Sequence, residues 1–160
     1  MTACMANQNG DFQVIAARGI VINGKNEVLV VSENGNKWHL PGGWIETLED
    51  PMTGCEREVY EEVGMQIKAQ KIIYITEFLQ KPEPPYVNTV QKFDLYCYCT
   101  IVGNQAINHD WIDHDNELIK YRKFIGNDEW KNSDNIYAPD ILKKIAISDI
   151  SSMLSCYNKM

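Results

Sequence analysis

Residues 43–65 read GWIETLEDPMTGCEREVYEEVGM, and this stretch decides the fold. It predicts a glycine-hinged loop that leads into a helix over residues 51–63. Asp50 stands where an N-cap residue is expected, Pro51 suits the first helical position, and Gly64 suits the C-terminal cap. The segment is therefore predicted to form a loop–helix–loop unit.

The expected helix has one apolar face and one acidic face. At about 100° per residue, a single apolar stripe forms on it. The members of the stripe are Met52, Cys55, Val59 and Val63. Glu58, Glu61 and Glu62 gather on the neighbouring face, where like charges repel one another. A bound divalent cation, Mg²⁺ or Mn²⁺, would relieve that repulsion, and a solvated acidic face is the alternative.

The whole segment resembles the Nudix box, G-x5-E-x7-R-E-U-x-E-E-x-G-U, in which U is a bulky apolar residue. All fixed positions match, namely Gly43, Glu49, Arg57, Glu58, Glu61, Glu62 and Gly64. Val59 and Met65 fill the apolar positions. Chance alone produces such a match in about one window in 10⁹. Residues 38–43 also resemble the strand and turn that lead into this box in many family members.

The resemblance implies a fold and an activity. The implied fold is the Nudix fold, an α+β protein of the α/β/α sandwich type, with a mixed β-sheet flanked by helices and a catalytic loop–helix–loop. The implied activity is metal-dependent hydrolysis of a phosphoanhydride bond in a nucleoside diphosphate linked to another group. Mg²⁺ or Mn²⁺ is the implied cofactor, and a small nucleotide is the implied substrate.

The same resemblance assigns roles within the box. Glu61 and Glu62 correspond to direct metal ligands, and Glu58 corresponds to a ligand or the general base. Arg57 is expected to orient these carboxylates, because a planar guanidinium can hold two acids in a defined geometry. Glu49 is expected to pair with Arg57 and to attach the loop to the helix.

Two further positions are candidates for the metal site. Gly43 is expected to offer its backbone carbonyl to a metal, since the missing side chain permits close approach, and a plain turn glycine is the alternative. Family members often draw an additional acid from a later loop, and Glu117 is the candidate for it. The acidic stretch before Glu117 lacks the spacing of an EF-hand, so a solvated polar loop is favoured over a second metal site. This stretch contains His109, Asp110, Asp113, His114 and Asp115.

Aromatic side chains are the natural platform for a nucleotide base. Trp38, Phe78 and Tyr86 are the candidates for substrate binding. Tyr96 and Tyr98 are also considered, although most aromatic residues in a sheet belong to its core.

The rest of the chain predicts several strands and a second helical region. Turn residues at 23–26 separate the first two strands and indicate a hairpin. The expected strands cover residues 13–22, 27–32, 37–40, 72–79, 89–102 and 119–125. The third of them stops at Pro41-Gly42-Gly43, and a proline-rich loop follows the fourth. Helical spacing returns at 140–150, through Ile141, Leu142, Ile145 and Ile150.

The composition sets the limits of this interpretation. The 160 residues, 44% hydrophobic and 23% charged, predict one domain over 1–160, with 1–12 as a flexible N-terminal segment. The formal net charge of −7 argues against a stable nucleic-acid partner but permits a small phosphate ligand on a metal.

Neither a secretory signal nor a membrane span is predicted, so we expect a cytoplasmic protein. Five cysteines without zinc-like spacing suggest free thiols. Homodimers are common in the family, although these residues do not establish one.

Three alternatives for the function remain open. Within hydrolysis, an ADP-ribose or other nucleoside diphosphate sugar is slightly favoured over a nucleoside triphosphate, because Pro82 lies near a proline typical of ADP-ribose hydrolases. A Nudix-fold sensor that binds a nucleotide without cutting it would usually have lost a box carboxylate. An RNA cap hydrolase would need a basic channel, whereas 15 Lys and Arg stand against 22 Asp and Glu.

Overall fold

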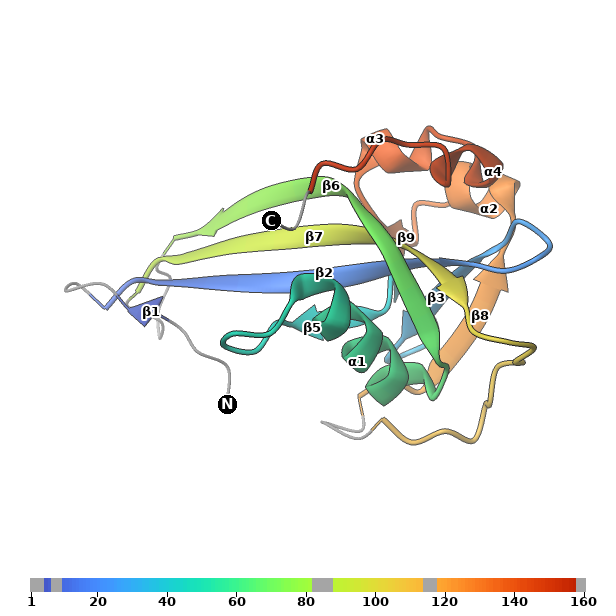
Figure 1. The fold of residues 1–160 in the computed structure, drawn as a ribbon, viewed down its shortest axis with the longest axis horizontal. Coiled ribbons are helices and arrows are strands. Elements are labelled where there is room, and N and C mark those ends of the chain that lie inside the picture. The colour runs from blue at the N-terminus through green and yellow to red at the C-terminus, as the bar shows by residue number, and fades with distance from the viewer. Residues whose placement is uncertain (1–4, 7–9, 82–87, 114–117, 158–160) are drawn as a thin grey trace.

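The computed structural model describes all residues except 1–4, 7–9, 82–87, 114–117 and 158–160 (Figure 1). Its elements are β1 (Met5–Ala6), β2 (Phe12–Ile22), β3 (Val28–Ser32), β4 (Trp38–His39), β5 (Gly42–Trp44), α1 (Pro51–Val63), β6 (Ile67–Gln80), β7 (Val90–Ile101), β8 (Tyr121–Ile125), α2 (Asn127–Asn132), β9 (Ile136–Tyr137), α3 (Asp140–Lys143) and α4 (Ile147–Ile150). The mixture of strands and helices agrees with the predicted α+β class.

The strands form one mixed sheet with the order β6-β7-β2-β3-β4-β9. β1 and β5 also pair with β2, and β8 pairs with β3. The long strands β6, β7 and β2 run side by side in Figure 1, β2 parallel to β7 and β6 antiparallel to it. The predicted hairpin is present, because β2 and β3 pair antiparallel across the turn at 23–27.

Helices cover both faces of this sheet (Figure 1). On one face, α1 packs its apolar stripe against residues of β2, β6 and β7. On the other face, α2, α3 and α4 cover β2 and β3 with four buried side chains, Trp130, Leu142, Ile147 and Ile150. The two cores on opposite faces confirm the α/β/α sandwich.

The alternation along β7 separates the two cores. Cys97 and Cys99 belong to the core under α1, whereas Tyr96 belongs to the core under α2–α4 and Tyr98 packs against it. The strand divides in this way because successive side chains of a strand point to opposite sides. The four cysteines among the described residues carry free thiols, as expected.

Helix α1 begins and ends at the predicted residues. The Asp50 carboxylate accepts hydrogen bonds from the amides of Met52 and Thr53, at 3.0 and 3.2 Å. Gly64 ends the helix with φ 71°, and its amide donates to the carbonyl of Tyr60. Both ends of the helix therefore have their backbone groups satisfied by local residues.

Two predicted elements differ from the structure. Residues 140–150 do not form one helix, because Ala146 has extended backbone angles (φ −63°, ψ 139°) that separate α3 from α4. As a result Ile141 is exposed, while Ile147 is buried. The strand predicted at 72–79 begins earlier, at Ile67, because β7 offers pairing as far as Ile101.

The ends of the chain are described only in part. Within the predicted flexible segment 1–12, Met5 and Ala6 pair with β2, and Phe12 is the first residue of β2. The rest of that prediction falls on residues outside the described ones. Within the described ranges, no helix combines the length and apolar character that a membrane crossing requires.

Candidate active site

Strand β5 holds the box loop against the sheet. Gly42 pairs with Arg18 and Gly43 with Ala17 in antiparallel register. A Cβ atom at Gly42 would lie 2.1 Å from the carbonyl oxygen of Ala17, and the φ of Gly42 is 138°. Only glycine fits such a close approach. The extended piece predicted at 37–40 ends before Pro41, as expected, whereas the separate strand β5 that begins at Gly42 was not predicted.

Gly43 allows the helix and the loop to approach each other. A Cβ atom at this position would lie 2.3 Å from Oε2 of Glu58. Gly43 is not among the residues with positive φ, so turn geometry does not require a glycine here. The close approach of the Glu58 carboxylate does require it, and the expected role of the Gly43 carbonyl in metal binding stays a prediction.

Arg57 connects the loop to three carboxylates of the box. Its Nε and Nη2 donate to the two oxygens of Glu49, at 2.8 and 2.9 Å. Its Nη1 donates to Glu58 at 2.9 Å and to Glu61 at 3.0 Å. Nη2 also donates to the carbonyl of Trp44 at 2.9 Å. The expected pairing of Arg57 with Glu49 is present, and one guanidinium thus orients both the loop and two helix acids.

The charges of this network stabilise one another. The hydrogen bond from Arg57 lowers the pKa of Glu49, against the opposing effect of burial. In return, the hydrogen bond to Glu49 raises the pKa of Arg57, and Glu58 raises it further. Both side chains therefore remain charged near neutral pH, and the two hydrogen bonds between Arg57 and Glu49 are maintained.

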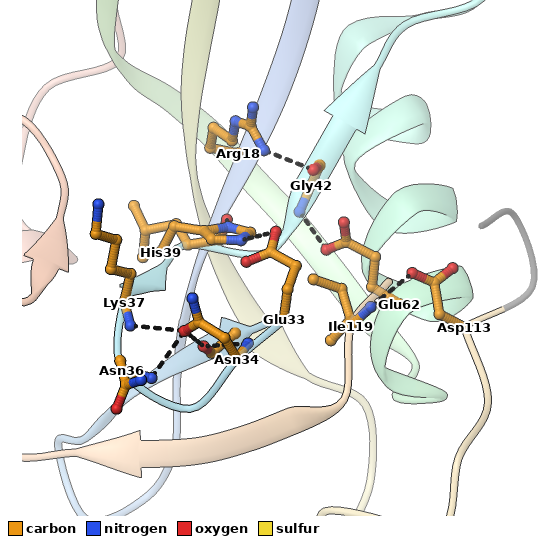
Figure 2. Close-up of polar contacts among 12 residues, drawn as sticks. Arg18, Glu33, Asn34, Asn36, Lys37, His39, Gly42, Glu62, Asp113 and Ile119 are labelled. Atoms are coloured by element: carbon orange, nitrogen blue, oxygen red, sulfur yellow. Dashed lines mark hydrogen bonds and ion pairs between the residues drawn. The ribbon is translucent and has the colours of Figure 1, made fainter. Parts of the chain in front are cut away.

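Glu62 has a different environment from the other two helix acids. Its Oε2 accepts the amide of Gly42 at 2.9 Å, while Arg18 donates to the carbonyl of Gly42 at 2.7 Å (Figure 2). Burial raises the pKa of Glu62 to about 8, and the charges of Glu58 and Asp113 add to this effect. The hydrogen bond from Gly42 and the charge of Arg18 oppose it. A cation bound nearby would favour the charged form of a carboxylate in this position.

Two side chains from outside the box hold the C-terminal end of α1. Nε1 of Trp111 donates to the carbonyl of Glu61 at 2.9 Å. The buried Arg122, on β8, donates from Nε to the carbonyl of Glu62 at 2.8 Å. These bonds satisfy helix carbonyls that lack an intrahelical partner. They also place the last turn of α1, where the two glutamates lie.

The three helix acids of the box line one cleft of about 500 Å³, here called the carboxylate cleft. Among its walls are Gly43, Arg57, Glu58, Glu61, Glu62 and Asp113. Oxygen donors of this kind suit Mg²⁺ or Mn²⁺. Among the described residues, no three His, Cys, Asp or Glu side chains converge on one metal position. Glu58 and Glu61 instead bind Arg57, and Glu62 binds Gly42.

A second cavity of about 680 Å³ adjoins the carboxylate cleft and is called the side cavity. The two spaces share Arg18, Glu33 and Glu62 as lining residues. Tyr96 and Tyr137 also line the side cavity. Ligand pockets in proteins commonly have volumes of about 300–1,000 Å³. A ligand that spans both spaces can thus place its reacting bond at the acids and a second group in the side cavity.

Several sequence candidates lie away from these spaces. Trp38 is half-buried against the core, and the ammonium group of Lys123 lies 4.5 Å from its ring centre. Phe78 is 60% exposed on the outer half of β6. Neither lines the two cavities, so the geometry gives no support to a base-binding role for them. Glu117 and Tyr86 lie outside the described residues.

Other residues of the cavities are not apparent from the sequence. Arg18 is the one charged residue of β2, and that contrast is the signal for it in the sequence. Asp113 is 5% exposed and accepts the amide of Ile119 at 3.3 Å, although the sequence predicts a solvated loop there. Nε2 of His39 lies 3.0 Å from Glu33 at the junction of the two cavities (Figure 2).

Similar solved structures share this fold. A NUDIX hydrolase from Nitrosomonas europaea aligns with a TM-score of 0.60 and 16% identity, over 90% of this chain and 93% of that one. An ADP-ribose pyrophosphatase from Streptococcus suis aligns with a TM-score of 0.52 and 20% identity, over 86% of this chain and 87% of that one. At such identities the likeness concerns the fold.

Sequence comparisons identify the family. The diphosphoinositol polyphosphate phosphohydrolase 2 of Rattus norvegicus is 34% identical over 91 residues, which cover 56% of this chain and 44% of that protein. The chain spans less than half the length of the curated relatives that it matches. The family model of the NUDIX domain matches residues 13–142. That match contains the box, the carboxylate cleft and most of the sheet, and the chain therefore belongs to the NUDIX domain family.

Proposed function

We propose that this protein is a metal-dependent hydrolase that cleaves the phosphoanhydride bond of a nucleoside diphosphate linked to a second group. One observation carries the proposal. The three helix acids Glu58, Glu61 and Glu62 line a cleft that shares three of its lining residues with the side cavity. A diphosphate at the acids would leave its attached group in the adjoining space.

The donor set fits Mg²⁺ or Mn²⁺. Glu58, Glu61, Glu62 and the carbonyl of Gly43 supply oxygen atoms, which these ions prefer. In this role, a bound ion would polarise the phosphoryl oxygens and lower the pKa of the attacking water. Because Arg57 binds Glu58 and Glu61 in the present arrangement, metal binding requires these two carboxylates to divide their oxygens between Arg57 and the ion.

The other residues of the cleft position the reacting groups. Arg57 and Glu49 keep the loop at a constant distance from the helix through two parallel hydrogen bonds. Glu58, which is nearly buried beside Gly43, is a ligand or the general base. Arg18 lines both cavities and donates to the carbonyl of Gly42, so it holds the loop beside the helix acids.

Among substrates, a nucleoside diphosphate sugar such as ADP-ribose is favoured over a nucleoside triphosphate. The side cavity is large enough for a sugar or a nucleoside on the far side of the diphosphate. The diphosphoinositol polyphosphate phosphohydrolase among the relatives makes an inositol pyrophosphate the second candidate.

The test is a substrate panel assayed with Mg²⁺, with Mn²⁺ and with a chelator. ADP-ribose, UDP-sugars, a deoxynucleoside triphosphate and a diphosphoinositol polyphosphate are each incubated with the enzyme, and products are separated by chromatography. We expect AMP and ribose 5-phosphate from ADP-ribose, and no turnover with the chelator. Release of pyrophosphate from the triphosphate alone would contradict the proposed substrate class.

A matched pair of variants tests the role of the helix acids. Glu58→Gln is expected to lower kcat at least about 100-fold, because it removes a ligand or the base. Glu56→Gln is the control, because Glu56 is on the same helix but accepts the amide of Ala69 rather than lining the cleft. Equal background rates for the native protein and Glu58→Gln, together with nucleotide binding, would favour a sensor.

A further inference from the structure

The charges around the side cavity bear on which group it can accept, and this inference rests on the proposed function. Five carboxylates line the cavity, those of Glu33, Glu62, Asp94, Asp134 and Asp140. Among the lining residues there is one arginine, Arg18, and one lysine, Lys143, and His39 is the third basic group. The walls therefore carry more negative than positive charge.

The two cations are already engaged with the protein. Arg18 donates to the carbonyl of Gly42 at 2.7 Å and forms an ion pair with Asp94 at 3.4 Å. Lys143 donates from Nζ to the carbonyls of Ser133 and Ile136, at 2.7 and 3.3 Å. A ligand phosphate would have to compete with these acceptors, so neither cation offers an uncommitted phosphate site.

His39 does not change this balance. Its two ring nitrogens lie near two acceptors, with Nδ1 3.1 Å from the carbonyl of Leu40 and Nε2 3.0 Å from Glu33 (Figure 2). Whether or not the ring carries a proton, the carboxylate of Glu33 faces it. The positive charge that His39 can add is therefore compensated locally.

Two of the carboxylates remain available to a ligand. Asp134 and Asp140 are exposed, and their side chains have no hydrogen-bond or ion-pair partner within the described part of the chain. Carboxylates accept hydrogen bonds from hydroxyl groups but repel phosphates. The rings of Tyr96 and Tyr137 and the apolar Leu40 supply a surface for the face of a sugar or a base.

We propose that the side cavity selects an uncharged, hydroxyl-bearing group and rejects a group that carries additional phosphates. Asp134 and Asp140 determine this specificity through charge repulsion. The substrate class is thereby narrowed to nucleoside diphosphates whose attached group has no further phosphate. Polyphosphorylated compounds, including inositol pyrophosphates, are excluded as good substrates.

The test compares ligands that differ by one phosphate. ADP-ribose is compared with ADP-ribose 2′-phosphate and with ADP-ribose 1″-phosphate, so that an extra phosphate is placed at either end of the molecule. Both kcat/KM and Kd are measured with Mg²⁺. We expect at least one analogue to be about tenfold poorer in both quantities, because like charges at close range strongly disfavour a complex. Equal values for the three ligands would overturn the proposal.

Reversing the charges of Asp134 and Asp140 tests whether these two residues cause the discrimination between the ligands. In the double variant Asp134→Lys, Asp140→Lys, the ratio of kcat/KM for the discriminated analogue to kcat/KM for ADP-ribose should rise at least about fivefold. The control is Asp128→Lys, Asp149→Lys, which makes the same change in net charge at acids that line neither cavity. Equal recovery in the control would refute a role for the cavity. The double variant Asp134→Asn, Asp140→Asn should give an intermediate recovery.

The measurement of Kd separates this inference from the proposed function. Discrimination in Kd without turnover of any ligand would leave the inference standing and would refute the hydrolase. Turnover of all three ligands at equal rates would support hydrolysis and refute the inference. If none of the three ligands is bound and no compound of the substrate panel is cleaved, both are wrong.

Discussion

The buried carboxyl group of Glu62 should make the stability of the metal-free protein depend on pH in an unusual direction. Its pKa is raised from 4.5 to about 8 in the folded protein, mainly by burial. The folded state therefore binds more protons than the unfolded state between these two values. The contribution of Glu62 to stability is complete below pH 4.5 and is lost as the pH rises towards 8.

The size of the effect follows from the shift. A full difference of one proton costs about 1.4 kcal/mol of unfolding free energy for each pH unit. Between pH 5 and 7 this amounts to almost 3 kcal/mol as an upper limit. Because the carboxylate lies at the wall of an open cleft, solvent screening reduces the expected loss to about 2 kcal/mol.

The assay is urea unfolding at several pH values from 5 to 8, with a chelator present, for the native protein and Glu62→Gln. The difference in unfolding free energy between the two proteins should fall by about 2 kcal/mol from pH 5 to 7. Glu56→Gln, on the same helix but outside both cavities, should keep the slope of the native protein. Parallel curves for the native protein and Glu62→Gln would refute the assignment of a buried, protonated Glu62.

Three more predictions follow from the same geometry. Arg57→Lys should lower the unfolding free energy by about 1–2 kcal/mol and should lower kcat/KM at least about tenfold, because an ammonium group cannot reproduce the double hydrogen bond to Glu49. Urea unfolding and steady-state kinetics measure the two effects. Gly43→Ala should lower kcat at least about tenfold, because the new Cβ would displace the carboxylate of Glu58. Gly24→Ala is its control, since no atom lies within 4 Å of a Cβ there, and equal kinetics for the two variants would contradict the prediction. Excess Mg²⁺ should raise the melting temperature more at pH 8 than at pH 6, because Glu62 must lose its proton to bind the ion. A Mg²⁺-induced shift of the melting temperature that does not depend on pH would contradict this role of Glu62.

The sequence alone predicts those features whose causes are local. Helix α1 has the expected bounds, because Asp50 and Gly64 satisfy the backbone groups of its own first and last turns. The two faces of β7 also follow from the sequence, since the alternation of side chains in a strand depends on the backbone alone. Glu58, Glu61 and Glu62 share a cleft because a helix places residues three and four positions apart side by side.

The tertiary structure decides which distant residues meet these acids. Arg18, Glu33 and Asp134 reach the cavities from segments far apart in the chain, and only the order and register of the strands bring them together. The strand formed by Gly42 and Gly43 likewise depends on its pairing with β2, which no local signal indicates. A helix cap or the alternation of a strand depends on neighbours within a few residues, whereas the lining of a cavity depends on long-range pairing of strands. For this physical reason the sequence alone predicts the box, and only the tertiary structure determines the specificity of the side cavity.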